Sequence, residues 1–234
     1  ELDSYFKEIN FKNTYIEIPT GVGFCMGVNK NVVNRIGMFD TIFGKGYGEE
    51  NDWCQRAIKE GYKNIHVTNL FVYHKHGGSF PSEEKAKLIE KNTITLNEKH
   101  NDYNIQVQEI IEKDELQELR DFIIFKIKSE KVYSTLIFDH KLGGGANHYN
   151  DDEIQNRLRE SQLICYVIYD FNQTKNYHLK FQYAEKTFSV ETDKITVLKK
   201  VLSLFKFDEI FLNSFVSFPK VKDIINVVID LQKK

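Results

Sequence analysis

The chain has 234 residues, 41% hydrophobic and 13% aromatic, which is enough to bury the core of one or two small domains and is not typical of a disordered protein. The formal net charge of -2 and the isoelectric point of about 6.4 exclude the broad basic surface on which nucleic-acid binding depends. The three cysteines, Cys25, Cys54 and Cys165, form no Cys-x-x-Cys pair, which argues against a disulfide framework or a zinc site and indicates reduced thiols in a cytoplasmic protein.

The sequence shows no signal for a membrane span or for export. No run of about 18 apolar residues occurs, and the first residues lack the charged-then-apolar pattern of a signal peptide. The sequence begins with Glu1 rather than Met, at a point where no fold obviously starts. We therefore expect it to be a piece excised from a longer polypeptide.

Residues 1–103 are expected to form one unit of short strands and short helices. Alternating side chains at 14–18 indicate a half-buried strand. A short helix follows, with Asn29 as its N-terminal cap and Gly37 at the position that favours a left-handed stop. The remaining expected elements of this unit are a helix from Asn51 or Asp52 to Gly61, a strand at 65–73, a loop at 74–81 and a helix at 82–100.

Residues 104–131 are expected to form a connecting helix, because the apolar positions from 107 to 131 have helical spacing. Residues 132–234 then alternate between buried-type strands and helices, which favours a mainly parallel sheet in a Rossmann-like α/β domain. The strands are expected at 134–139, 163–169, 178–183, 187–190 and 208–213, and the helices from the capping box at 150–153, at 194–206 and from Pro219 onward.

Residues 14–82 carry a series of short motifs whose order is more informative than any one of them. The motifs are Gly23-Phe24-Cys25-Met26, then Ile36-Gly37-Met38-Phe39-Asp40, then Gly46-Tyr47-Gly48-Glu49-Glu50-Asn51-Asp52-Trp53-Cys54, and finally His74 after the next expected strand. In this order they resemble the C-terminal, acceptor-side half of family 2 glycosyltransferases of the GT-A type. The resemblance implies an enzyme that transfers a sugar from a nucleotide-sugar donor to a hydroxyl of a glycan or glycoprotein acceptor.

The resemblance also assigns chemical roles to the acidic residues of the third motif. It implies that Glu50 is the general base, because an inverting transfer needs a carboxylate that takes the proton from the attacking acceptor hydroxyl. It implies that Glu49 and Asp52 are acceptor-binding or supporting groups. Trp53 could stack on a sugar ring, although a core position suits it equally well. Family members usually have Glu-Asp at positions 49 and 50, so Glu50 changes the reach of the base but not its chemistry. The alternative is that these acids only cap and complement a helix start.

His74 is implied as a ligand of a divalent metal, Mn or Mg, that the family holds with an upstream Asp-x-Asp and shares with the donor pyrophosphate. The alternative is a solvated loop histidine, which is the preferred interpretation for His76. No Asp-x-Asp precedes Gly21, and no N-terminal βαβ units are present to hold a nucleotide base. The donor-binding half is therefore expected upstream of Glu1, and residues 1–234 alone are expected to be inactive.

A second, weaker resemblance concerns residues 132–234. The strand ending in Phe138-Asp139-His140 is followed by the glycine-rich stretch Gly143-Gly144-Gly145, and Ile210-Phe211-Leu212-Asn213-Ser214 comes later. Together they resemble the N-terminal Rossmann-like domain of GT-B type glycosyltransferases. Backbone amides in such a turn can approach a substrate or phosphate oxygen, whereas the alternative is a tight turn that binds no ligand.

The leading hypothesis is a fragment of an inverting glycosyltransferase that acts in bacterial-type surface polysaccharide or glycoprotein glycan assembly. Its expected location is the cytoplasm, with attachment at the inner face of the membrane as a second option, and other transferases are its expected partners. The competing hypothesis is a non-catalytic module that binds a glycan or a protein. A third hypothesis makes residues 132–234 a nucleotide-binding regulatory domain.

Overall fold

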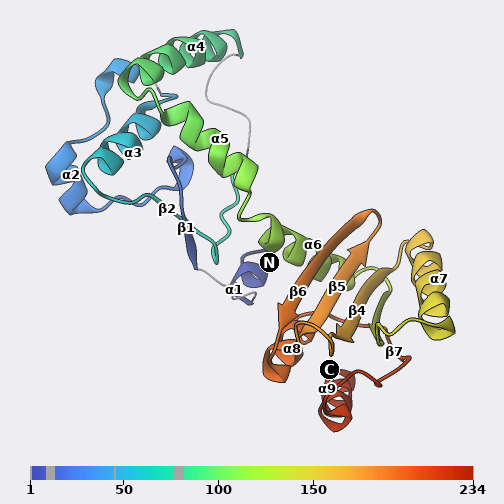
Figure 1. The fold of residues 1–234 in the computed structure, drawn as a ribbon. Coiled ribbons are helices and arrows are strands. Elements are labelled where there is room, and N and C mark those ends of the chain that lie inside the picture. The colour runs from blue at the N-terminus through green and yellow to red at the C-terminus, as the bar shows by residue number, and fades with distance from the viewer. Residues whose placement is uncertain (1, 9–13, 45, 76–81, 234) are drawn as a thin grey trace. The chain divides into compact units, whose positions relative to one another are not determined.

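The computed structural model describes residues 2–8, 14–44, 46–75 and 82–233 (Figure 1). The chain divides into two compact units, Glu1–Gln117 and Glu118–Lys234. In the described part of the chain, no helix combines the length and the apolar character needed to cross a membrane.

The division falls inside the segment 104–131, and the single connecting helix expected there is not present. Helix α5 spans Tyr103–Lys113 and helix α6 spans Gln117–Ser129. Asp114 separates them, because its backbone is left-handed with a φ of 38° and its amide donates to the carbonyl of Ile110. A helix commonly ends on such a residue, so the helical spacing of the sequence continues across a break in the backbone.

The first unit consists of short helices beside a two-stranded sheet. Its elements are α1 (Leu2–Glu8), β1 (Tyr15–Glu17), α2 (Lys30–Ile36), α3 (Glu49–Lys59), β2 (Ile65–Val67), α4 (Ser82–Lys99) and α5, with 3-10 turns at Gly23–Cys25 and Thr41–Phe43. β1 and β2 are antiparallel, with Ile16 opposite His66. β2 is shorter than the strand expected at 65–73, because β1 offers only three residues for pairing and no other described strand continues the ladder.

Two helix boundaries in this unit show how local sequence sets the backbone. The side chain of Asn29 caps α2, and Gly37 follows that helix with a φ of 80°, as the sequence predicted. α3 begins earlier than expected, at Glu49, and Gly61 follows its end with a φ of 82°. Glu49 and Glu50 therefore lie in the first turn of α3 rather than in front of it.

A small apolar cluster joins α2 to α3. Its buried members are Val32, Trp53, Cys54 and Ala57, and Met26, Val33 and Ile36 pack against them. The apolar side chains of each helix recur at helical spacing, so a single stripe of each helix faces the other. This cluster supports the half of α3 that carries the acidic motif.

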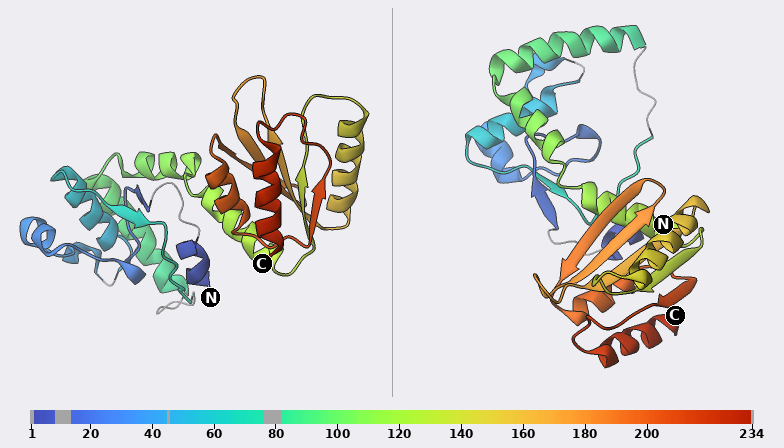
Figure 2. Two further views of the ribbon diagram at one scale, coloured as in Figure 1. Left: turned by 90° about the horizontal axis from the view of Figure 1, so that it is seen from below. Right: turned by 45° about the vertical axis from the view of Figure 1, so that its right-hand side comes forward.

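The second unit is an α/β domain with a mixed five-stranded sheet (Figure 2). Its elements are α6, β3 (Ser134–Phe138), α7 (Gly145–Arg159), β4 (Leu163–Tyr169), β5 (Tyr177–Tyr183), β6 (Lys186–Thr192), α8 (Ile195–Leu202), β7 (Glu209–Leu212) and α9 (Val221–Gln232). The strand order is β6-β5-β4-β3-β7. β3 is parallel to β4 and β7, whereas β5 is antiparallel to β4 and β6. The expected parallel, Rossmann-like arrangement is thus found in one half of the sheet, and a hairpin completes the other half.

Helices cover both faces of this sheet, with α7 on one face and α6, α8 and α9 on the other (Figure 2). All five residues of β3 are buried, as expected of a central strand between two helical layers. On the α7 face, Ile137 and Ile164 pack with Ile154. On the other face, the ring of Phe125 from α6 lies 5.1 Å from that of Phe181 on β5. The core of the second unit is therefore built from both sides of one sheet.

Candidate active site

The acidic pair predicted to be functional lies in the first turn of α3. A Cβ placed on Gly46 would lie 3.5 Å from Oε1 of Glu49, and one on Gly23 would lie 3.6 Å from Oε1 of Glu50. Glu49 therefore folds back toward the loop before the helix, whereas Glu50 faces the loop around Gly23. The Oε2 atom of each carboxyl is buried and accepts no hydrogen bond from the described residues. Burial, together with repulsion from Glu50, raises the pKa of Glu49.

The loop in front of this turn has a fixed shape that requires glycine at one position. Gly48 has a φ of 132°, and a Cβ there would lie 2.9 Å from Cδ1 of the buried Phe43 ring. The side-chain amide of Asn92, on α4, donates to the carbonyls of both Phe43 and Gly46 at 2.8 Å. The loop that leads into the acidic pair is thus held in place by α4 as well as by α3.

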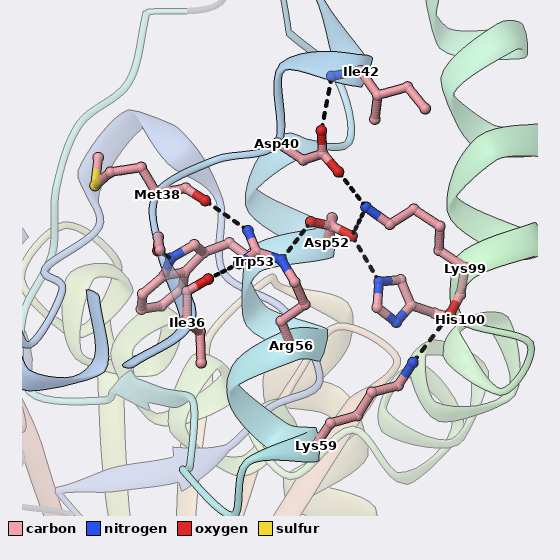
Figure 3. Close-up of polar contacts among 11 residues, drawn as sticks. Ile36, Met38, Asp40, Ile42, Asp52, Trp53, Arg56, Lys59, Lys99 and His100 are labelled. Carbon is pink, nitrogen blue, oxygen red and sulfur yellow. Dashed lines mark hydrogen bonds and ion pairs between the residues drawn. The ribbon is translucent and has the colours of Figure 1, made fainter. Parts of the chain in front are cut away.

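Asp52, one turn into α3, is the centre of a polar cluster (Figure 3). The side chain is fully buried. Oδ2 accepts a hydrogen bond from Nε of Arg56 at 2.8 Å, and Oδ1 lies 2.8 Å from both Nζ of Lys99 and Nε2 of His100. Nζ of Lys99 also lies 2.6 Å from Oδ2 of Asp40. Both oxygens of Asp52 are therefore engaged inside the protein, so Asp52 is placed to organise the site rather than to contact an acceptor.

The cluster keeps its carboxylates ionised. Burial alone would raise the pKa of Asp52, but hydrogen bonds from Lys99, His100 and Arg56 more than offset it, and the pKa lies below its ordinary value. The hydrogen bond from Lys99 likewise lowers the pKa of Asp40. For Lys99, burial acts to lower the pKa, and the bonds to Asp40 and Asp52 outweigh it and raise the pKa. Lys99 is thus held as a cation between two anions.

Arg56 and Trp53 fasten the same stretch of α3 to the turn after α2. The guanidinium of Arg56 donates to the carbonyls of Ile36 and Met38 at 2.6 and 2.8 Å. The indole N–H of Trp53 donates to the carbonyl of Gly37 at 2.9 Å, and the ring is only 4% exposed. Trp53 therefore occupies the core position that the sequence left open as an alternative to stacking on a sugar.

A further set of contacts ties the loop of residues 20–21 to α3. The hydroxyl of Thr20 donates to Oδ1 of Asn51 at 2.7 Å, and the amide of Gly21 donates to Sγ of Cys54 at 3.3 Å. Burial, opposed by a hydrogen bond with Thr20 and reinforced by the charge of Glu50, raises the pKa of Tyr103. The phenol of Tyr103, at the start of α5, thus lies on the side of α3 that Glu50 faces.

Three contributors to this site carry no motif in the sequence. Asn92, Lys99 and His100 lie beyond the region that carries the family resemblance. Their one local signal is spacing: Asn92, Leu96 and Lys99 follow one another by four and three residues, which places them on one face of a helix. That pattern predicts a packed face but not its partner, because the partner is on a distant helix.

His74 lies next to the loop that carries Phe24. The imidazole is exposed and stacks on the ring of Phe24, with centroids 4.4 Å apart and planes at 21°. Among the described residues, no group of three His, Cys, Asp or Glu side chains could hold a metal ion. The described residues therefore do not fit a bound divalent metal by themselves, and no role of a metal is derived from them. His76 lies outside the described residues.

In the second unit, the glycine-rich stretch leads directly into α7, which begins earlier than the capping box at 150–153 suggested. Gly143 and Gly144 have φ values of 81° and 96°, and Gly145 is the first residue of the helix. Oδ1 of Asn147 accepts from the amide of Gly143 at 2.8 Å, while its amide group donates to the carbonyl of His140 at 2.6 Å. The loop is thus a short turn that is held by hydrogen bonds with a side chain of the helix that follows it.

A buried carboxylate supports that turn. Asp139, which follows β3, is fully buried. Its oxygens accept hydrogen bonds from the side chains of Asn150, Asn213 and Tyr166 at 2.6, 3.0 and 3.1 Å, and more weakly from Asn147 at 3.2 Å. Burial and the nearby carboxylate raise the pKa of Tyr166, so its hydroxyl remains a donor. These contacts join the carboxyl ends of β3 and β7 to α7.

Comparison of the chain with family models, with curated proteins and with solved structures gave no match. The first unit offers the more specific chemistry, because it combines two carboxyls of one helical turn with a cluster that holds their helix in place.

Proposed function

We propose that the first unit forms the acceptor side of an inverting glycosyltransferase, with Glu50 as its general base. The observation that carries the proposal is the acidic pair in the first turn of α3, where each carboxyl has one buried oxygen without a hydrogen-bond donor among the described residues. Such oxygens are suited to hydroxyl groups of an acceptor sugar, since a buried acceptor without a donor is costly. The order of the motifs from Gly23 to His74, which resembles that of family 2 glycosyltransferases, also supports the proposal.

In the proposed reaction, the acceptor hydroxyl attacks the anomeric carbon of a nucleotide sugar while Glu50 takes its proton. The new glycosidic bond forms as the bond to the nucleoside diphosphate breaks, and the diphosphate leaves with that bonding pair. The N-terminal end of α3 favours the ionised carboxylate that a base needs before the reaction. Glu49, whose pKa is raised by burial, accepts a hydrogen bond from a neighbouring acceptor hydroxyl.

The proposal leaves donor binding to chain outside the described residues. The second unit has a glycine-rich turn at Gly143 to Gly145, but the described residues of the first unit form no nucleotide-binding βαβ unit. A divalent ion, Mn or Mg, would likewise need ligands other than the described ones. Asp52 and Trp53 enter the proposal as residues that hold α3, because both are buried.

The test uses the intact polypeptide that contains this chain, supplied with nucleotide sugars, a divalent ion and a panel of glycan acceptors. We expect acceptor-dependent release of nucleoside diphosphate, and we expect Glu50→Gln to lower kcat by roughly 10²- to 10⁴-fold. Glu98→Gln, which removes the same charge from an exposed position on α4, is the matched control and should retain activity. Fluorescence of Trp53, the single tryptophan of residues 1–234, checks in that segment that each variant is folded.

Two results would contradict the proposal in different ways. Full activity of Glu50→Gln would remove Glu50 as the base. Acceptor binding without any sugar transfer by the intact polypeptide would instead favour the non-catalytic glycan-binding module.

A further inference from the structure

We propose that Lys99 and His100 are positioning residues for the acidic pair, and that they act on it through Asp52. This inference rests on the proposed function, because it concerns the reactivity of Glu49 and Glu50. In this role, none of Asp52, Lys99 and His100 needs to contact a substrate.

The geometry joins Asp52 to the pair by a short, rigid path. The amide of Asp52 donates to the carbonyl of Gly48 at 2.9 Å, so residues 48 to 52 form one closed turn that includes Glu49 and Glu50. The side chain of Asp52 points to Lys99 and His100 (Figure 3). Any shift of Asp52 relative to α4 must therefore move the turn that carries the acidic pair.

One face of α4 provides both supports of this turn. Asn92 holds the loop before α3 through the carbonyls of Phe43 and Gly46, and Lys99 holds Asp52 two helical turns further on. Leu96 lies between them on the same face and is 4% exposed. Asn92 thus fixes the loop on one side of the pair, and Lys99 with His100 fixes the helix on the other.

The charges of the cluster balance only while Lys99 is present. Asp40 and Asp52 contribute two negative charges, and Lys99 and Arg56 contribute two positive charges. Nε2 of His100 lies 2.8 Å from Oδ1 of Asp52, and its Nδ1 is buried without a partner among the described residues. Loss of the Lys99 charge would leave a net negative cluster beside Glu49 and Glu50, which raises the pKa of nearby carboxyls.

The test compares Lys99→Met with Lys99→Arg and with Lys87→Met. Lys87 lies on α4 and pairs with Glu83 on the exposed side, so its replacement removes the same charge from the same helix without touching the cluster. In the intact polypeptide, we expect Lys99→Met to lower kcat by about 10- to 100-fold at unchanged acceptor KM and to move the acidic limb of the pH profile to higher pH. Lys99→Arg should restore most of the activity, and Lys87→Met should leave both kcat and the pH profile unchanged. His100→Leu should lower kcat in the same direction by a smaller factor.

A second measurement does not depend on activity. Carbon-13 NMR of glutamate carboxyls in residues 1–234 follows the titration of Glu49 and Glu50, and we expect Lys99→Met to shift their midpoints to higher pH. Unchanged midpoints and unchanged kcat in folded Lys99→Met would overturn the positioning role. If Trp53 fluorescence shows that Lys99→Met does not fold, His100→Leu is measured instead. Unchanged titration midpoints and unchanged kcat in folded His100→Leu would then overturn the positioning role. If the intact wild-type polypeptide transfers no sugar while the midpoints still shift, the proposed function fails and the electrostatic coupling stands.

Discussion

The two units are equal in length but differ in what holds them together. Among the described residues, six buried hydrophobic side chains lie in the first unit and twenty-five in the second. The second unit surrounds its sheet with aromatic and aliphatic side chains, whereas the first unit fixes its central helix with hydrogen bonds and ion pairs around Asp52. The stabilisation from apolar burial changes little with small displacements or with pH, whereas the stabilisation from a polar cluster depends on its geometry and charge. The difference suits the proposed function, in which the helix of the first unit holds Glu49 and Glu50 in a defined place.

The largest expected effect is in the apolar core of the second unit. Phe125 is fully buried and its ring contacts those of Phe181 and Phe205, each at 5.1 Å between centroids. We expect Phe125→Ala to lower the free energy of unfolding by about 3–5 kcal/mol, measured by urea denaturation and far-UV circular dichroism. Phe171→Ala, at a position 62% exposed, should change it by less than about 0.5 kcal/mol. Equal effects of the two substitutions would contradict the burial argument.

The corresponding change in the first unit is Asp52→Ala. It leaves Lys99, Arg56 and His100 without their shared acceptor, and removing one partner of a buried pair usually costs about 3–5 kcal/mol. Because Lys99 and Arg56 remain 30% and 23% exposed, water can solvate them in part, and we expect about 2–3 kcal/mol. Urea denaturation followed by Trp53 fluorescence measures the free energy of unfolding of this unit.

The exposed Asp102, whose side chain caps nothing, provides the control for that experiment. Asp102→Ala should leave the Trp53 transition within about 0.5 kcal/mol of the wild type. If Asp52→Ala were as mild as Asp102→Ala, the first unit would not depend on its polar cluster, and the contrast between the units would be lost.

The same contrast explains how far the sequence could predict the structure. The strand at 163–169 matches β4 to the residue, and the cap at Asn29 is confirmed, because both are set by side chains a few residues apart. The split at Asp114 was missed, since helical spacing on both sides concealed one left-handed residue. The direction of β5 was not predicted either, because alternation marks a strand but not its partner.

For the candidate site, the sequence placed Glu49 and Glu50 just before a helix, whereas α3 begins at Glu49, and it found the order of the motifs around them. It could not find Lys99 or His100, which reach Asp52 across nearly fifty residues. Nor could it show that Trp53 is buried by α2, since an aromatic residue on a helix suits a core and a sugar site equally. Long-range polar contacts leave no periodic trace in a single sequence.

A smaller effect is expected at Gly48, where the loop before the acidic pair meets Phe43. Alanine would force a left-handed backbone on a residue with a Cβ and press that atom against the ring, which sits 2.9 Å away. We expect Gly48→Ala to cost about 2 kcal/mol in the Trp53-monitored transition. Gly27→Ala is the matched control, because a Cβ there meets nothing within 4 Å and the backbone is not left-handed. If Gly48→Ala left the free energy of unfolding unchanged, α4 and the loop would have to shift at little cost. The acidic pair would then be held less firmly than the contacts indicate.

The smallest effect is the pH dependence of the first unit. The pKa of Asp52 is lower in the folded protein than its ordinary value of 3.8, since hydrogen bonds from Lys99, His100 and Arg56 outweigh its burial. A lowered pKa adds stability that is fully present above the ordinary value and is lost as the pH falls through the folded value. We therefore expect the Trp53 transition to weaken as the pH falls below about 4, and Asp52→Asn to remove part of that dependence because its amide does not titrate. An Asp52→Asn profile parallel to that of the wild type would show that other carboxyls govern acid unfolding, and that the polar cluster stabilises the first unit through geometry rather than through the charge of Asp52.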